Sequence, residues 1–222
     1  MGKVYDSNST VIAHAVEELG CEAVRFGIVP DDEVQLEEVL RQALEFDFVL
    51  LSGGTSKGEG DLNYRVFEKF HDPGVLVHGV SLKPGKPLCL AVLEGTPAAI
   101  LPGFPTSSTF TFSKFIAPVL RKLAGLAPER NAHVQAKVPL RLNSDKGRTE
   151  FNLVHLVRNK DGFSAYSTGK GSGSITGFAR ADGFMEIPRN TEMLEAGEET
   201  TIHLLGETAR PSDLMIIGSH CV

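Results

Sequence analysis

The sequence has few cysteines, and none is spaced as a metal ligand or a disulfide partner would be. The three cysteines, Cys21, Cys89 and Cys221, are odd in number, far apart and never in a Cys-x-x-Cys pair. The seven histidines are scattered and lack the short paired spacing of a zinc site. A chain of 222 residues can bury a sizeable core without disulfides. We therefore interpret the cysteines as packing residues and expect no structural transition metal.

Long apolar runs and an excess of basic charge are also missing. No window approaches the roughly 18 consecutive apolar residues of a membrane-spanning helix, and the N-terminus lacks the basic and then apolar stretch of a signal peptide. There are 22 lysines and arginines against 28 acidic residues, a formal net charge of -6. Phosphate contacts need clustered basic side chains, so this balance disfavours a nucleic-acid-binding surface. We expect a cytoplasmic protein that binds neither membranes nor nucleic acid.

The first half of the chain begins with two repeats of a helix followed by a strand. Polar and acidic residues at 6–8 and 31–33 each precede apolar residues at helical spacing, which predicts two capped helices. The segments 21–28 and 48–51 have the composition of short buried strands. This alternation predicts an α/β domain with a parallel sheet.

The next segments add an antiparallel part to that sheet. A third helix is predicted over 62–70 and a strand over 75–80. The apolar stretches 88–92 and 98–101 flank a short connection with Gly and Pro, which predicts a hairpin at one edge. A helix that Pro118 kinks follows. We therefore predict a mostly parallel sheet with one antiparallel edge.

The second half of the chain has a different pattern. From about His133, short alternating stretches are separated by Asn, Asp, Gly and Pro, which predicts a small all-β domain. The segment 126–131 is the predicted linker. We expect an α/β domain at 1–125, a β domain at 132–206, and a tail at 207–222 that resembles the start of a further, incomplete domain.

The strongest candidate for a binding loop is the glycine-rich segment 52–61, SGGTSKGEGD, which lies between a predicted buried strand and a helix. Ligands of open α/β sheets lie beyond the carboxyl ends of the strands, where glycines let backbone N–H groups approach an anion or a flat ring. Gly58 is followed by Glu59 and not by Lys and Ser or Thr, so the segment is not a Walker A loop, and it lacks the spacing of three glycines of a dinucleotide fingerprint. Glu59 and Asp61 could hold Mg²⁺ beside a phosphate; alternatively, Asp61 caps the next helix.

Two lysines in a stiff segment form a second candidate. Lys83 and Lys86 lie in 81–87, SLKPGKP, where two prolines limit the entropy lost on binding. Such a pair could hold an oxyanion or a phosphate. The alternative is a solvated loop between strands.

A third candidate follows another predicted strand, at 101–108, LPGFPTSS. Thr106 or Ser107 could cap a helix whose free N–H groups attract anions. Since all three candidate loops follow apolar strands, we expect them to converge on one rim.

The β half offers two weaker candidates. Arg148 lies on a turn that enters a strand, and Ser172 lies in the segment 168–174, which is rich in glycine and hydroxyl side chains. The alternative for Arg148 is an ion pair with Glu150 or another surface acid.

Taken together, these segments resemble the molybdopterin molybdenumtransferase (molybdenum insertase) family, to which the E domain of gephyrin belongs. The resemblance extends from Gly2 to about Leu205. The motifs that carry it are Tyr5-Asp6-Ser7-Asn8, the pair Asp31 and Asp32, Ser52-Gly53-Gly54-x-Ser56-x-Gly58-x-x-Asp61, Lys83-Pro84-Gly85-Lys86-Pro87, Leu101-Pro102-Gly103-x-Pro105 and Gly147-Arg148-x-Glu150-Phe151.

The resemblance implies a fold and a reaction. The fold is a three-layer αβα molybdopterin-binding domain followed by a small all-β barrel-like domain. The reaction is the Mg²⁺-dependent insertion of molybdate into adenylylated molybdopterin, with release of AMP. Molybdate is a tetrahedral dianion, which lysines, a guanidinium and hydroxyls can bind. A homodimer and a molybdopterin adenylyltransferase partner are also implied.

The resemblance assigns roles to individual residues. Asp61 matches the family's metal-linked aspartate, with Glu59 beside it, and one of Asp31 and Asp32 matches a second functional acid. The predicted catalytic residues are Asp61, Lys83 and Lys86. The other predicted cofactor-binding residues are Gly53, Gly54, Ser56, Gly58, Pro102, Gly103, Pro105, Ser107, Arg148 and Ser172, of which Ser107, Arg148 and Ser172, with the two lysines, are implicated in holding the oxyanion.

The sequence also departs from the family's pattern. Family members carry two further N-terminal subdomains and an initial strand with a Thr-Gly-Asp-Glu motif, so we expect another copy to fill the place of that strand, or the chain to be unstable. Phe104 replaces the usual Asn of Pro-Gly-Asn-Pro. Two alternatives stay open: a noncatalytic pterin-binding or scaffold module, and an enzyme similar to molybdopterin adenylyltransferase, which generally lacks the β domain.

Overall fold

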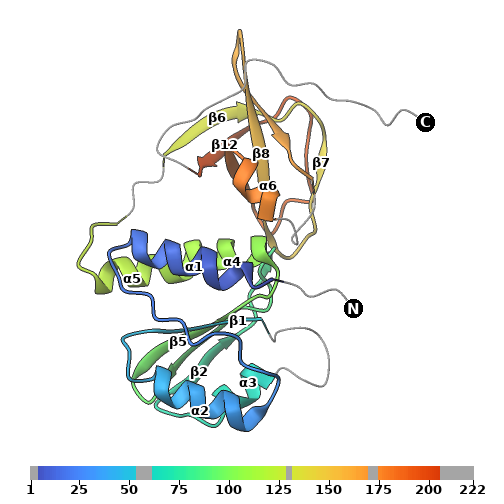
Figure 1. The fold of residues 1–222 in the computed structure, drawn as a ribbon. Helices are drawn as coiled ribbons and strands as arrows, with labels where there is room; N and C mark the ends of the chain where they lie inside the picture. Colours follow the sequence, from blue (N-terminus) through green and yellow to red (C-terminus); the bar gives the residue numbers. More distant parts are fainter. Residues whose placement is uncertain (1–4, 54–61, 129–131, 170–174, 206–222) are drawn as a thin grey trace. The chain divides into compact units, whose positions relative to one another are not determined.

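The structure of the chain is a computed structural model that describes residues 5–53, 62–128, 132–169 and 175–205. The chain divides into two compact units (Figure 1). The first unit comprises residues 1–80 and 84–129, and the second comprises 81–83 and 130–222. Each unit is described by itself below.

The first unit combines helices with a mixed four-stranded sheet. The strand order is β1-β5-β4-β2, in which β1 and β5 are parallel and the other two pairings are antiparallel. The elements in chain order are α1 (Ser7–Glu18), α2 (Glu33–Ala43), β1 (Val49–Ser52), α3 (Leu62–Phe67), β2 (Gly74–His78), β4 (Cys89–Leu93), β5 (Thr96–Leu101), α4 (Pro105–Thr111), the π-helical turn η1 (Phe112–Ile116) and α5 (Ala117–Leu123).

Helices cover both faces of this sheet, which gives three layers (Figure 1). Successive side chains of a strand point to opposite faces, and β5 is buried on both. Ala98 and Ile100 pack in a cluster with residues of α2 and α3, whereas Ala99 and Leu101 pack with residues of α1, η1 and α5. The three-layer αβα architecture is therefore confirmed, and so is the hairpin of β4 and β5.

The predicted strand at 21–28 is wrong, because residues 21–30 have no regular secondary structure. Ala23 packs with the cluster on the α1 side and Val29 with the cluster on the α2 side, so the segment crosses between the two helical layers instead of lying in the sheet. The ring of Phe26 meets that of Phe46 edge-on at 5.9 Å. Without this strand, β1–β5 is the one parallel pairing among the described strands of this four-stranded sheet, whose other two pairings are antiparallel; the prediction of a mostly parallel sheet is therefore wrong.

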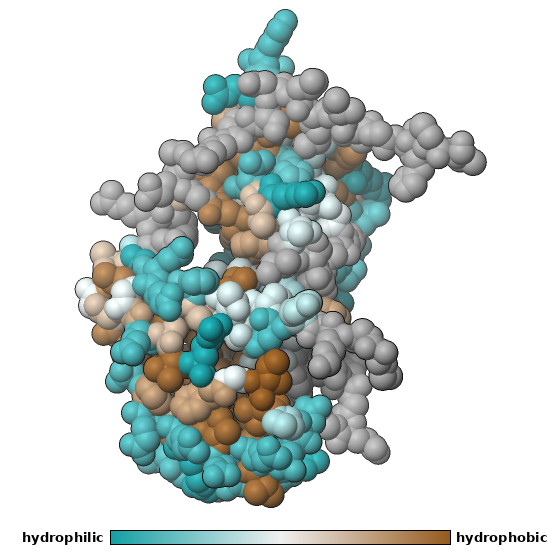
Figure 2. Space-filling model, in the orientation of Figure 1, coloured by the Kyte–Doolittle hydropathy of each residue, from teal (hydrophilic) through white to brown (hydrophobic). Residues whose placement is uncertain are grey.

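Apolar side chains of this crossing segment stay at the surface. Val24, Phe26 and Ile28 are 48%, 41% and 79% exposed. Figure 2 shows hydrophobic side chains gathered on the first unit between α1 and α2, where this segment runs in Figure 1. The segment thus hides less apolar area than a strand inside the sheet would.

The helix ends largely follow the sequence-based predictions. Asp6 caps α1 by accepting a hydrogen bond from the Ser9 N–H, and Asp32 caps α2 through the Gln35 N–H. Pro118 lies in the first turn of α5, immediately after the π-helical turn, so the irregularity predicted at this proline is present one turn earlier.

The second unit is rich in strands. Its elements are β3 (Leu82–Lys83), β6 (His133–Lys137), β7 (Leu142–Asn143), β8 (Thr149–Asn159), β9 (Gly162–Ser167), the short helix α6 (Ile175–Arg180), β10 (Gly183–Ile187), β11 (Met193–Leu194) and β12 (Glu199–Leu204). The order β10-β12-β6-β9-β8, together with the pairing of β10 with β8, closes a five-stranded barrel. The predicted barrel-like β domain is confirmed.

The barrel encloses its own core and includes one piece of the first half of the chain. Val154, Met185 and Ile202 are among its fully buried residues. A Cβ at Gly183 would lie 2.5 Å from the His203 carbonyl oxygen, so only glycine fits between β10 and β12 there. The two residues of β3 pair in parallel with β8.

None of the helices in the described residues has the length and apolar composition of a membrane-spanning helix.

Candidate functional site

Gly53 and Gly103, which belong to two of the three candidate loops, lie side by side in the first unit, at the carboxyl ends of the parallel strands β1 and β5. The Gly53 N–H donates to the Leu101 carbonyl oxygen at 3.1 Å, which extends the pairing of the two strands by one step. A Cβ built on Gly103 would lie 3.5 Å from the Cα of Gly53. The two backbones therefore approach closely where an α/β sheet binds its ligands.

Two asparagine side chains hold these loops. The Asn8 side-chain amide, at the start of α1, donates to the Ser52 hydroxyl and to the Gly103 carbonyl oxygen, both at 2.9 Å. The Asn63 amide, at the start of α3, donates to the Gly53 carbonyl oxygen at 2.7 Å. Asn63 was missed by the sequence analysis; its one available signal was its position just after the glycine-rich segment.

The helix α4, which follows the candidate loop at 101–104, begins differently from the prediction. Phe104 is the N-cap of α4 and makes no side-chain capping bond, and Pro105 takes the first turn. The predicted capping by Thr106 or Ser107 is therefore wrong: proline favours the first helical position, which places both hydroxyl residues inside the helix. Ser107 is 4% exposed, so its predicted contact with an oxyanion stays a prediction.

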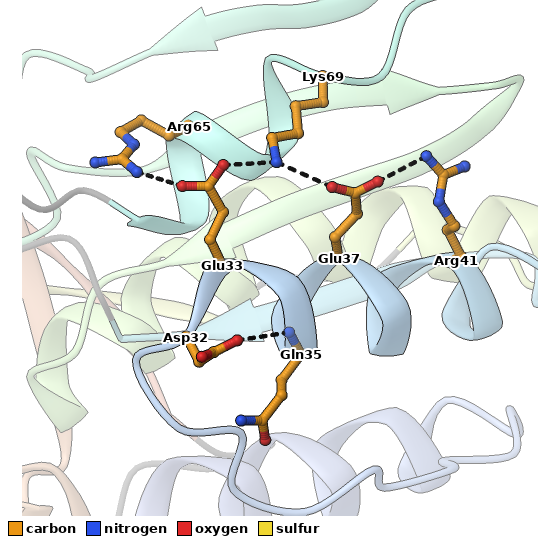
Figure 3. Close-up of polar contacts among 7 residues, drawn as sticks. All are labelled: Asp32, Glu33, Gln35, Glu37, Arg41, Arg65 and Lys69. Carbon is orange, nitrogen blue, oxygen red and sulfur yellow. Dashed lines mark hydrogen bonds and ion pairs between the residues drawn. The ribbon is translucent and has the colours of Figure 1, made fainter.

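The acidic pair near α2 has a structural role in part. Asp32 accepts from the Gln35 N–H at 2.9 Å as the helix cap (Figure 3), and Asp31 is exposed. Capping accounts for an aspartate at position 32 without any ligand. That one of these two acids is functional stays a prediction.

Beside this cap, charged side chains link α2 to α3 (Figure 3). Lys69 lies 2.6 Å from Glu33 and 2.9 Å from Glu37, Arg65 pairs with Glu33, and Arg41 pairs with Glu37 at 2.8 Å. Hydrogen bonds from Lys69 and then Arg65 hold the pKa of Glu33 below its ordinary value of 4.5. This exposed network joins the two helices and was not predicted.

Lys83 belongs to a second cluster, in the second unit. Its Nζ lies 2.8 Å from Asp145 Oδ2 and 3.2 Å from Glu150 Oε2. Arg148 Nη2 lies 3.3 Å from the same Asp145 oxygen. Burial lowers the pKa of the Lys83 ammonium, but the hydrogen bonds to Asp145 and Glu150 outweigh it, so the pKa of Lys83 is raised above 10.5. Lys83 therefore stays charged at neutral pH.

The structure does not test the predicted lysine clamp. Lys86 is exposed and belongs to the first unit, whereas Lys83 belongs to the second. The Lys86 carbonyl oxygen accepts from the Val80 N–H at 2.8 Å, which fixes the backbone of the turn. The joint action of the two lysines stays a prediction.

The predicted metal ligands and parts of two candidate segments, 52–61 and 168–174, lie outside the described residues. These positions are Gly54, Ser56, Gly58, Glu59, Asp61 and Ser172. Within the described part of the chain, no group of three or more His, Cys, Asp and Glu side chains could hold a metal ion. The predicted Mg²⁺ ligands thus remain those that the sequence suggested.

Comparisons with known proteins agree with this two-part arrangement. Residues 1–122 match the family described as "Probable molybdopterin binding domain". Residues 135–205 match the family described as "MoeA C-terminal region (domain IV)". The first match includes both β1 and β5 with their loops, and the second includes the five strands of the barrel, apart from the first two residues of β6.

Individual relatives match over nearly the whole chain. The molybdopterin molybdenumtransferase of Haemophilus influenzae is 32% identical over 213 residues, which cover 92% of this chain and 52% of the relative. Gephyrin of Dictyostelium discoideum is 28% identical over 241 residues, 92% of this chain and 33% of the relative.

A solved structure gives the same result. The molybdopterin biosynthesis MoeA protein of Pyrococcus horikoshii superposes with a TM-score of 0.76 at 33% sequence identity, over 93% of this chain and 49% of that one. The chain therefore spans about half the length of the Haemophilus and Pyrococcus proteins that it matches. It belongs to the molybdopterin molybdenumtransferase (molybdenum insertase) family.

Proposed function

We propose that this chain carries the part of a molybdenum insertase that binds molybdopterin and molybdate, and that it takes part in the insertion of molybdate into adenylylated molybdopterin with release of AMP. The observation that carries the proposal is the close approach of Gly53 and Gly103 at the carboxyl ends of two parallel strands. Membership of the family supports the same conclusion.

The glycine loops would bind the pterin. Backbone groups at Gly53 and Gly103 carry no side chain that would keep a flat ring or a phosphate at a distance. Gly54, Ser56 and Gly58 would continue this contact along the glycine-rich segment, and Pro102 and Pro105 would keep the second loop rigid.

The positively charged residues would hold the oxyanion. Lys83 and Arg148 meet around one oxygen in the second unit, and Lys86, Ser107 and Ser172 would supply further donors. Ammonium and guanidinium groups form short, strong hydrogen bonds with anionic oxygens. Molybdate, as a dianion with four oxygens, can accept from several of them at once.

Mg²⁺ would be held by Asp61 with Glu59, and it would offset charge on the phosphates when the adenylyl bond is cleaved. Carboxylate oxygens are suitable ligands for this ion. As a second acid, Asp31 is the simpler choice, since Asp32 already caps α2.

The proposal also includes a division into domains at 1–125 and 132–206, a homodimer, a molybdopterin adenylyltransferase partner and a cytoplasmic location. We also propose that another copy of the chain covers the edge of β1, since β1 lies at one end of the described strand order. An adenylyltransferase-like activity is less well supported, because residues 135–205 match the C-terminal domain of MoeA proteins.

The experiment that tests the proposal measures AMP release from adenylylated molybdopterin, with Mg²⁺, in the presence and absence of molybdate. Release that molybdate stimulates is the expected result, and Asp61→Ala should abolish it while the circular dichroism spectrum stays unchanged. Binding of the pterin without any turnover would instead identify a noncatalytic module. Unchanged turnover in Asp61→Ala would remove the assigned role of that aspartate.

A further inference from the structure

One carboxylate oxygen in the second unit lies between two cations. Asp145 Oδ2 is 2.8 Å from the Lys83 ammonium and 3.3 Å from the Arg148 guanidinium. Lys83 and Arg148 are the two positively charged residues of this unit that would bind the oxyanion in the proposed function. The position that an oxygen of a bound oxyanion would take is therefore filled by an oxygen of the protein itself.

The second carboxylate of the cluster is fixed in a different way. Glu150 stands opposite Lys83 in the parallel pairing of β3 with β8, and its side chain is 4% exposed. The Ser144 hydroxyl donates to the same Oε2 at 3.0 Å. Because removal of a partner leaves a buried charge uncompensated, this contact is costly to break. Glu150 therefore keeps Lys83 in place whether or not Asp145 is bound.

Asp145 is more easily displaced. Its side chain is 48% exposed, and it lies on the connection between β7 and β8, not on a strand. Arg148, its second partner, is 41% exposed. Ion pairs in contact with solvent contribute little to stability, since water and salt replace them readily. A dianion of higher charge can compete with a single carboxylate for these two cations.

We propose that Asp145 occupies the oxyanion position in the free protein and is displaced by the substrate oxyanion, whose oxygen then accepts from Lys83 and Arg148 in its place. This inference rests on the proposed function. Because the Asp145 carboxylate must be displaced, it lowers the affinity of the protein for oxyanions. Before displacement, it keeps the two cations at the spacing that an oxyanion needs. Asp145 is thus an affinity-determining residue that competes for the site, and it takes no part in the chemistry.

The test is a calorimetric titration of the full chain with molybdate at constant ionic strength. Asp145→Asn keeps the size of the side chain and removes the competing charge, so we expect it to bind molybdate roughly twofold to fivefold more tightly, the range that corresponds to one exposed ion pair. Arg148→Gln should weaken binding. Sulfate, a smaller tetrahedral dianion, serves as a second probe.

The matched control is Glu192→Gln. It makes the same change in net charge and frees Lys146, the neighbour of Asp145, from an exposed ion pair of 2.7 Å. A general effect of net charge would make both variants bind more tightly, and this outcome would overturn the proposal. So would an affinity in Asp145→Asn equal to or below that of the wild type.

The two levels of the account fail in different ways. If Arg148→Gln weakens molybdate binding but Asp145→Asn does not strengthen it, the displacement is wrong and the oxyanion site of the proposed function remains. If Arg148→Gln and the wild type bind molybdate equally, or neither binds it, the site itself is wrong and both proposals fall. Tighter binding in Asp145→Asn alone, with the control unchanged, is the result that supports the displacement.

Discussion

Lys83 stands directly opposite Glu150, in a parallel pairing of two strands that belong to distant parts of the chain. Its ammonium nitrogen lies 3.2 Å from the buried carboxylate. The short strand β3 carries Lys83 into the second unit although the residues on both sides of it belong to the first. This one pairing therefore brings a residue of the molybdopterin-binding half of the sequence into contact with the C-terminal domain.

Replacing Lys83 should destabilise the protein. Lys83→Met leaves the Glu150 carboxylate with the Ser144 hydroxyl but without its nearest cation, and we expect a loss of about 2 kcal/mol in the free energy of unfolding, measured with urea. The double variant Lys83→Met, Glu150→Gln should recover part of the loss, because no charge is then left buried. The exposed pair of Lys146 and Glu192 is the control, and its double-mutant cycle should show little or no coupling. Equal coupling in both cycles would contradict the account.

The stability of the first unit should depend on pH through the network of α2 and α3. The pKa values of Glu33 and Glu37 are lowered in the folded protein, mainly by hydrogen bonds from Lys69 and from Arg41 respectively. Their contribution is therefore present at pH values above the unfolded pKa of 4.5 and is lost as the pH falls below it. Lys69→Met should flatten this dependence in urea unfolding measured between pH 3 and pH 6, and added salt should weaken it. The same substitution at the exposed Lys122 is the control; an identical flattening there would rule the network out.

Position 104 offers a way to stabilise α4. Phe104 is the N-cap of this helix, has no capping bond and is 63% exposed. Asparagine is among the best capping residues, so Phe104→Asn should raise the free energy of unfolding by about 1 kcal/mol. Thermal unfolding measures this change in stability. The control is Phe104→Ala, which also removes the exposed ring but cannot cap the helix, so it separates the effect of capping from the effect of losing the ring. If asparagine and alanine change the melting temperature equally, the capping argument fails.

Local signals in the sequence predicted much of the fold. The caps at Asp6 and Asp32 were visible because capping depends on residues within one helical turn. The hairpin of β4 and β5 was visible because its connection carries a tight-turn sequence. The approach of the loops after β1 and β5 followed from the rule that places ligands at the carboxyl ends of strands.

Contacts between distant segments could not be predicted in the same way. The residues 21–28 have the composition of a strand, but the side chains of the crossing segment pack on two different helical layers. Packing of this kind depends on the tertiary structure and not on the local sequence. Lys83 was predicted from its position in a proline-rich segment and from the resemblance, but nothing local indicated that Asp145 and Glu150 would surround it. Thr106 and Ser107 failed as caps because Pro105 starts the helix before them.

The central claim is that the loops after β1 and β5 form the molybdopterin site, and Asn8 tests it most directly because its amide bonds to both loops. The measurement is a fluorescence titration of molybdopterin with the wild type, with Asn8→Ala, and with the control Asn159→Ala, which removes a hydrogen bond to Ser164 in the other unit. We predict that Asn8→Ala weakens binding roughly twofold to tenfold, as the loss of one or two hydrogen bonds would, and that the control binds like the wild type. Equal affinities of Asn8→Ala and the wild type would contradict the claim.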